Sequence, residues 1–124
     1  SPTITANFST NGETGGNVFI YGQNAGLRST AKNYTISSAT ANLAIATQGF
    51  GARVTGGSLT SVAPYNDSAD NVGIVDTSIR KIFSSTIPIA GGNGTFVLKA
   101  KSAPLTPAAN DYGETVTVIA AGNF

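Results

Sequence analysis

The sequence contains no cysteine, no histidine, no methionine and no tryptophan. Without histidine or cysteine, the chain alone cannot form a Ser-His triad, a thiol nucleophile or an ordinary zinc site. The lack of cysteine also excludes a disulfide framework, although it leaves an oxidising compartment permitted. We therefore predict a protein that is not an enzyme and that needs no cofactor.

Charge is also scarce, since charged residues make up only 10% of the chain and the formal net charge is +1. The cationic residues are scattered and form no basic stripe of the kind that binds phosphate backbones, so we expect no nucleic-acid partner. No apolar run approaches the roughly 20 residues of a membrane-spanning helix, so we expect no membrane span. Hydrophobic residues make up 40% of the chain, and they fall in short periodic runs, which argues against disorder.

The one kind of enzyme chemistry that these residue types still allow is carboxylate chemistry of the glycosidase kind. It requires two acids that face one cleft. Most of the acids lie in turns or at strand ends, where acids ordinarily serve as solvated turn residues. The six acids are Glu13, Asp67, Asp70, Asp76, Asp111 and Glu114.

The segment NDSADN, residues 66–71, is the one candidate metal site in the sequence. Asn66, Asp67, Asp70 and Asn71 offer the hard oxygen donors that calcium prefers. Their spacing matches no EF-hand loop, and the same residues are common in plain turns. We predict a turn without a metal and keep calcium as the alternative.

Helical periodicity is nearly absent, because glycine or β-branched residues interrupt every candidate window. Strand patterns repeat instead, in short runs closed by turn residues. These runs cover residues 3–9, 16–22, 33–37, 42–47, 50–55, 72–79, 81–89, 95–101 and 112–120. They predict one all-β domain over residues 1–124, an antiparallel Greek-key β-sandwich of immunoglobulin-like or jelly-roll type.

Turn signals predict how neighbouring strands connect. Asn11-Gly12 predicts a hairpin that joins the first two runs, and the segment GGNG, residues 91–94, predicts another that joins 81–89 to 95–101. In the run 95–101, alternation predicts that Phe96, Leu98 and Ala100 face the core while both lysines face water. Residues 56–71 have no pattern and are predicted to form a surface loop.

That loop carries two candidate surface residues. Tyr65, next to Pro64, is the one good candidate for an exposed contact with a sugar or a protein, but the sequence favours packing within the loop as its role. Asn66 begins an N-x-S/T sequon, as does Asn93 in the predicted GGNG turn. Both asparagines are candidate glycosylation sites because the predicted loops would expose them.

The first ten residues, SPTITANFST, alternate as a half-buried strand does and place Ile4, Ala6 and Phe8 on one face. Two interpretations share this pattern. The segment is either the first strand of its own domain, or an edge strand donated to a neighbouring subunit, where those three side chains would be buried. We keep both interpretations as predictions.

The segment PAANDYGETVTV, residues 107–118, resembles the final strand of chaperone-usher and spore-coat-type pilins, in which a Tyr after a Pro or Gly connection opens an alternating Thr/Val strand. Four further blocks resemble small secreted proteins of unknown function from uncultured bacteria. These blocks are GQNAGL, APYND, DNVGIVDTSIR and the stretch from TFVLKAK to the end of the sequence. This resemblance implies an extracellular, cell-surface location. Pilins of these families usually carry a disulfide and this chain has no cysteine, so any filament would be held together by strand pairing and packing.

Together these features predict a structural subunit of an extracellular surface filament, pilus- or fimbria-like, or of a coat. It would assemble with copies of itself by β-strand addition. The alternative is a secreted sandwich module that binds a glycan or a protein of a host or cell surface, and so acts in adhesion. A carboxylate hydrolase is the third hypothesis.

Overall fold

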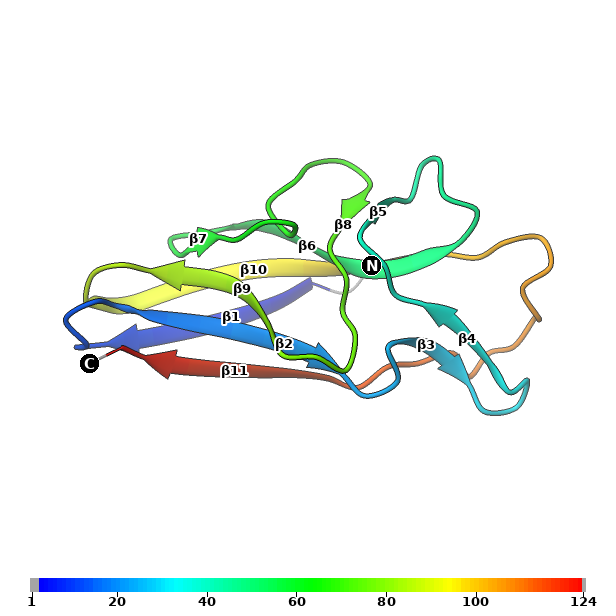
Figure 1. The fold of residues 1–124 in the computed structure, drawn as a ribbon, viewed down its shortest axis with the longest axis horizontal. Coiled ribbons are helices and arrows are strands. Elements are labelled where there is room, and N and C mark those ends of the chain that lie inside the picture. The colour runs from blue at the N-terminus through cyan, green and yellow to red at the C-terminus, as the bar shows by residue number, and fades with distance from the viewer. Residues whose placement is uncertain (1–2, 124) are drawn as a thin grey trace.

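The computed structural model describes residues 3–123, and these form an all-β fold with no helix in that range (Figure 1). Across the same residues, no helix has the length and apolar character needed to cross a membrane. The strands are β1 (Thr3–Thr10), β2 (Gly16–Gly22), β3 (Gly26–Ser29), β4 (Tyr34–Ser37), β5 (Ala41–Asn42), β6 (Gly49–Gly57), β7 (Thr60–Ser61), β8 (Asn71–Val72), β9 (Arg80–Ser85), β10 (Ile89–Lys101) and β11 (Val116–Gly122).

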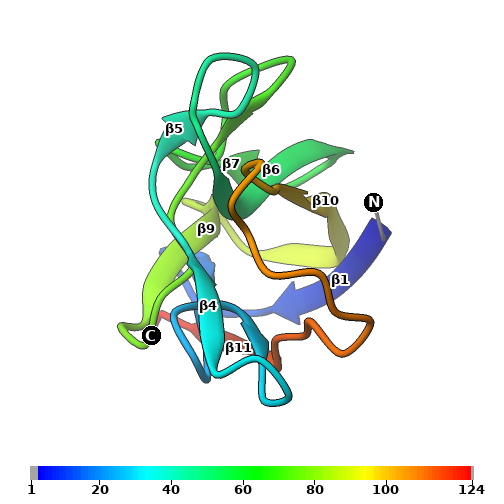
Figure 2. The same cartoon turned by 90° about the vertical axis from the view of Figure 1, so that its right-hand side faces the viewer.

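Two larger antiparallel sheets run along the molecule. One has the strand order β1-β10-β6, and the other has the order β11-β2-β9-β7. Two short ribbons, β3-β4 and β5-β8, complete the described strands. Figures 1 and 2 show the two larger sheets as layers that face each other along the long axis.

The core lies between these sheets, because both contribute side chains to one buried cluster. The rings of Phe96 from β10 and Phe83 from β9 meet there, with their centroids 6.4 Å apart and their planes tilted by 54°. Gly94 faces the same ring of Phe83, and a Cβ at that position would lie only 2.4 Å from it. The glycine therefore allows the sheets to approach closely.

The predicted hairpin between the first two runs is wrong. The runs themselves form strands β1 and β2, but these strands belong to different sheets. Strand β1 pairs with β10, whereas β2 lies between β11 and β9. The connection turns at Gly12, whose carbonyl accepts a hydrogen bond from the Gly15 amide at 2.9 Å, and it crosses from one layer to the other.

The predicted hairpin at residues 91–94 is also wrong. These residues lie inside β10, which runs without interruption from Ile89 to Lys101. A β-bulge occurs there: Phe8 pairs with Gly92, but Thr10 pairs with Ile89. Gly91 has a φ of +66° and forms part of the extra length of β10 at the bulge. The glycines thus serve a bulge and a close approach instead of a turn.

Other differences concern the extent of strands. The runs 42–47 and 72–79 contribute only the short strands β5 and β8, and the predicted loop 56–71 contains the end of β6 and all of β7. In β10 the predicted inward face is only partly buried, since Phe96 is buried, Leu98 packs against the core and Ala100 is exposed. The lysines of β10 are half-buried beneath neighbouring loops.

Candidate functional site

Strands β1 and β11 each lie at the edge of their sheet. Among residues 3–123, each pairs with one strand only: β1 with β10, and β11 with β2. The two edge strands lie on the same side of the molecule and run in the same direction (Figures 1 and 2). We call β1, β11 and the space between them the open side.

The core-facing side chains of β11 are poorly covered. Val118 pairs with Ile20 and Ala120 pairs with Val18, and directly paired residues point to the same face of a sheet. Ile20 and Val18 are buried at 0% and 1% exposure, but Val118 is 39% exposed and Ala120 is also exposed. The second sheet therefore presents its inner face to solvent along β11.

Strand β1 forms the other wall of the open side. Its inward residues are Ile4, Ala6 and Phe8, as the alternation predicts, and Ile4 pairs directly with the buried Phe96. Phe8 is 9% exposed, whereas Ile4 and Ala6 are half-buried against the core. Residues 1 and 2 of the predicted donor segment lie outside the described residues. In this structure the described part of the segment pairs within its own chain, and its donation to a neighbour stays a prediction.

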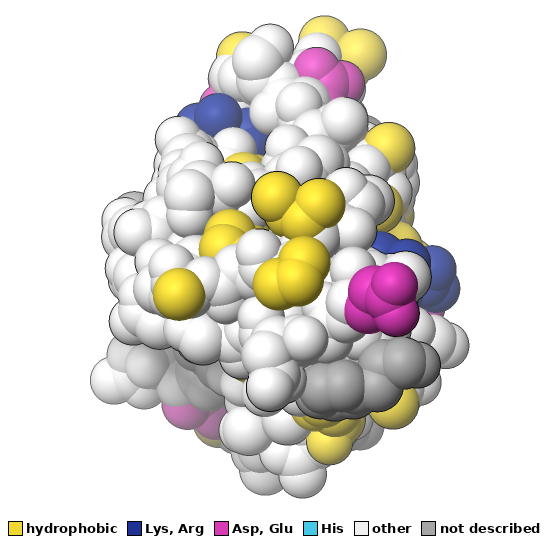
Figure 3. Space-filling model, turned by 90° about the vertical axis from the view of Figure 1, so that its left-hand side faces the viewer, with side chains coloured by type: hydrophobic (Ala, Val, Ile, Leu, Met, Phe, Trp, Pro, Cys, Tyr) yellow, Lys and Arg dark blue, Asp and Glu magenta, His cyan; other side chains and the backbone are white. Residues whose placement is uncertain are grey.

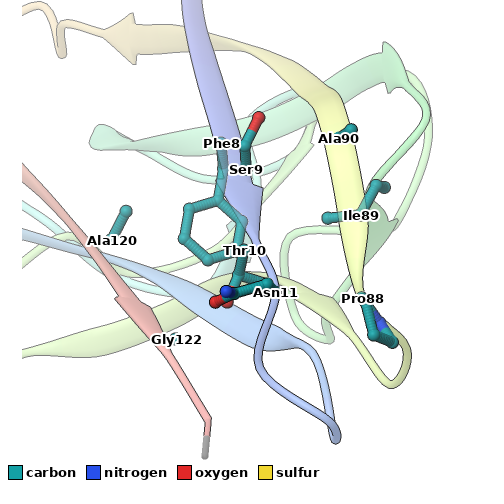
Figure 4. A pocket seen from close by; sticks show the side chains of 9 residues that line it. All are labelled: Phe8, Ser9, Thr10, Asn11, Pro88, Ile89, Ala90, Ala120 and Gly122. Atoms are coloured by element: carbon teal, nitrogen blue, oxygen red, sulfur yellow. The ribbon is translucent and has the colours of Figure 1, made fainter.

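An open depression of about 760 Å³ lies where β1 and β11 end. Phe8 lies on the β1 side, Ala120 and Gly122 lie on the β11 side, and Ile89 enters from β10 (Figure 4). Figure 3, which views this end of the molecule, shows hydrophobic side chains gathered over a mostly uncharged surface. The described residues that line it are Phe8, Ser9, Thr10, Asn11, Pro88, Ile89, Ala90, Ala120 and Gly122.

Among the described residues of this lining there is no acid, base or nucleophile beyond hydroxyl groups and an amide. It suits an extended, uncharged peptide segment, because β11 adds a free backbone edge to the apolar side chains.

Two carboxylates hold loops at the opposite end of the molecule. Glu114 accepts hydrogen bonds from the backbone amides of Asn24 at 2.8 Å and Gly26 at 3.2 Å. Asp111 accepts hydrogen bonds from the Ser29 hydroxyl at 2.5 Å and the Ala31 amide at 3.0 Å. The hydrogen bond from Ser29 is the main reason that the pKa of Asp111 lies below its usual value. These acids join the segment around β3 to the segment before β11.

Asp76 and Asp70 form ion pairs. Asp76 accepts a bidentate hydrogen bond from Arg80, at 2.8 and 2.7 Å, and this bond lowers the pKa of Asp76. Asp70 accepts a hydrogen bond from Lys99 at 2.9 Å, which lowers its pKa in the same way. The four acids Asp70, Asp76, Asp111 and Glu114 are therefore engaged in structural contacts.

The 66–71 segment uses its polar groups locally. The Ser68 amide donates to Asp67 at 2.8 Å, and the Asn71 side-chain amide donates to the Ser68 carbonyl at 3.0 Å. Within residues 3–123, no three acid, histidine or cysteine side chains are grouped closely enough to hold a metal ion.

The prediction that Tyr65 forms an exposed contact is wrong. Its side chain is 1% exposed, its hydroxyl donates to the Ile74 carbonyl at 2.5 Å, and its carbonyl accepts from the Val54 amide at 2.8 Å. Burial raises the pKa of Tyr65 to about 12. Packing within the loop, the role that the sequence favoured, is the observed one, because the segment folds back over β6 and buries the ring.

The two candidate glycosylation sites lie in different settings. Asn66 is exposed in a turn, as predicted. Asn93 is exposed but lies within β10, where its side-chain oxygen accepts from the Ser58 amide at 3.0 Å, so its predicted loop position is wrong. Glycosylation itself stays a prediction at both residues.

Sequence reasoning missed the open edge of β11. The available signal was the composition of residues 115–123, TVTVIAAGN, which contain no charge and no proline, the residues that usually protect an exposed sheet edge. No family model matches this chain, and searches of curated proteins and of solved structures also found no match. The geometry of the open side is therefore the basis on which a function can be assigned.

Proposed function

We propose that this protein is a non-enzymatic structural subunit of an extracellular surface filament, pilus- or fimbria-like, or of a coat, and that it assembles with copies of itself by β-strand addition. The fold would be a Greek-key β-sandwich of immunoglobulin-like or jelly-roll type. The observation that carries the proposal is the edge strand β1, which pairs only with β10 among residues 3–123 and buries Phe8 against the core. The edge of β10 that β1 occupies is a template on which β1 of a neighbour could pair instead.

Strand β1 is suited to donation. Seven of its residues pair with residues of β10, and among the described residues it pairs with no other strand. A neighbour's β1 could occupy the same register, so exchange would conserve these contacts while linking two copies. Phe8, buried at the end of the strand, would be the main anchor.

The extracellular location follows from the low charge, the richness in Thr, Ser, Asn and Gly and the resemblance to secreted proteins. The alternative function, a module that binds a glycan or surface protein, relied on the loop 56–71, with Tyr65 as its exposed contact. Since Tyr65 is buried, no residue now favours that alternative over assembly.

The test is electron microscopy and sedimentation of three forms: the full chain, a chain without residues 1–10, and Phe8→Ala. We expect filaments from the full chain and none from the truncated chain. Phe8→Ala removes a buried anchor, at a cost of about 3–5 kcal/mol per subunit contact, and should shorten or abolish filaments. Thr5→Ala, on the exposed face of the same strand, is the matched control and should leave them intact.

A truncated chain that still polymerises would refute donation by residues 1–10. A full chain that stays a monodisperse monomer would refute the filament and favour the binding module.

A further inference from the structure

Strand β11 is uncharged, and among residues 3–123 no strand pairs with its free edge. Residues 116–122 contain no lysine, glutamate or proline, and their pairing with β2 contains no bulge. Large apolar side chains are exposed on both faces of the strand, Val118 at 39% on the inner face and Ile119 at 37% on the outer face. One additional strand paired with this edge would lie beside both of these side chains and reduce their exposure.

We propose that β11 pairs with β11 of a second copy in antiparallel orientation, centred on Ile119. Pairing the whole strand with itself places Val116 opposite Gly122 of the second copy, and Ile119 opposite its own counterpart on a twofold axis. Such an isologous contact joins the two four-stranded sheets into one continuous sheet.

The side chains are complementary in this register. On the inner face, Val116 lies opposite Gly122 and Val118 lies opposite Ala120, so each large residue meets a small one. Gly122 borders the open depression and leaves space for the valine that faces it. On the outer face, the two Ile119 side chains meet at the axis and bury each other. Directly opposed residues in antiparallel strands are close enough for these contacts.

The partner must be a strand, because the free edge of β11 presents alternating backbone amides and carbonyls that only extended backbone can pair throughout. A second copy satisfies this requirement without an electrostatic penalty, since residues 115–123 carry no charge that would be repelled by its own copy. The twofold register also accounts for the exposed Ile119 side chain on the outer face of β11. Donation of β1 would leave that side chain exposed.

This contact is separate from the proposed exchange of β1, which replaces a strand on β10 and leaves the edge of β11 unpaired. The dimer contact can therefore be present whether or not residues 1–10 are donated.

Cysteine cross-linking tests the register, because the natural chain contains no cysteine. In Ile119→Cys, the two residues opposed across the axis have the Cα separation of about 4.4–6.8 Å that a disulfide requires. In Ala121→Cys, on the same face, the two thiols lie four residues apart along the strand, roughly 13 Å. Under mild oxidation we expect at least tenfold more covalent dimer from Ile119→Cys.

Ile119→Lys tests the same contact without oxidation. Two lysines at the axis should repel each other, and sedimentation should show loss of the dimer. Ile79→Lys is the control, since Ile79 is 61% exposed and lies outside all strands; it should leave the dimer unchanged.

Equal cross-linking of the two cysteine variants, or a dimer that survives Ile119→Lys, would overturn the β11 pairing. So would a full chain that sediments as a monomer at millimolar concentration. Filaments that form without cross-linking of Ile119→Cys would overturn this contact alone and leave the proposed function standing. Dimers that persist after removal of residues 1–10, with no filaments, would support both proposals.

Discussion

Strands β6 and β11 are both sheet edges, but one is closed and the other is open. Along β6, the Val54 amide donates to Tyr65, and Ala52 exchanges two hydrogen bonds with Gly73, at 3.0 and 2.8 Å. The Phe50 carbonyl accepts from the Ala39 amide and from the Ser38 hydroxyl. Along β11, no equivalent contact covers the free edge within residues 3–123.

The difference arises from the route of the chain and not from the strands themselves. The long connection from β6 to β9 folds back over β6, and the ion pair between Asp70 and Lys99 helps to hold it there. The connection before β11 instead contacts the β3–β4 ribbon through Asp111 and Glu114. An edge is thus protected where a loop returns over it, and in the part of the chain that the structure describes no loop returns over β11.

The largest effect should come from removing the tyrosine that closes β6. Tyr65→Ala deletes a ring that is 1% exposed and a hydrogen bond to Ile74. We therefore expect the free energy of unfolding to fall by about 3–5 kcal/mol. Urea denaturation followed by circular dichroism measures this change. A loss below about 1 kcal/mol would show that the loop does not stabilise the closed edge.

A matched pair of valines compares the two edges directly. Val72, beside β6, is 1% exposed, whereas Val118 on β11 is 39% exposed. Each substitution by alanine removes two methyl groups, worth about 0.8 kcal/mol each when fully buried. We expect Val72→Ala to destabilise the monomer by about 2 kcal/mol, including the cavity, and Val118→Ala by less than about 1 kcal/mol. Equal losses in urea unfolding would contradict the distinction between closed and open edges.

The smallest effect concerns alkaline pH. Burial raises the pKa of Tyr65 to about 12 in the folded protein, above the value near 10 of an unfolded tyrosine. The stabilisation that the folded protein gains from keeping the Tyr65 hydroxyl protonated is therefore fully present below about pH 10, and it is lost as the pH rises towards 12. Tyr65→Phe lacks it, so the difference in unfolding free energy between the natural protein and this variant should narrow by about 1 kcal/mol from pH 9 to 11. A constant difference would argue against a buried hydroxyl.

Period-two alternation predicted individual strands well where it was strong. The run 16–22 matches β2 at both ends, and the run 3–9 matches β1 to within one residue. The inward face of β1, with Ile4, Ala6 and Phe8, was also predicted correctly. These predictions succeeded because a strand alternates its side chains whatever strand it pairs with.

Pairing was predicted poorly because it depends on distant segments. Asn11-Gly12 and the glycines at 91–94 are typical of tight turns, but nothing local shows whether the flanking strands stay in one sheet. β1 instead pairs with β10, about 90 residues further along the chain. The candidate site could not be assembled from sequence for the same reason.

The sequence by itself determined that this is an all-β chain without histidine or cysteine chemistry, because residue types and local alternation need no partner to be read. Only the tertiary structure decided that Tyr65 is buried, that β6 is closed and that β11 remains open. Those features depend on which loop returns over which edge. Residues 115–123 show only that neither charge nor proline protects the edge of β11. Which loop returns over which strand depends on long-range packing and backbone hydrogen bonding.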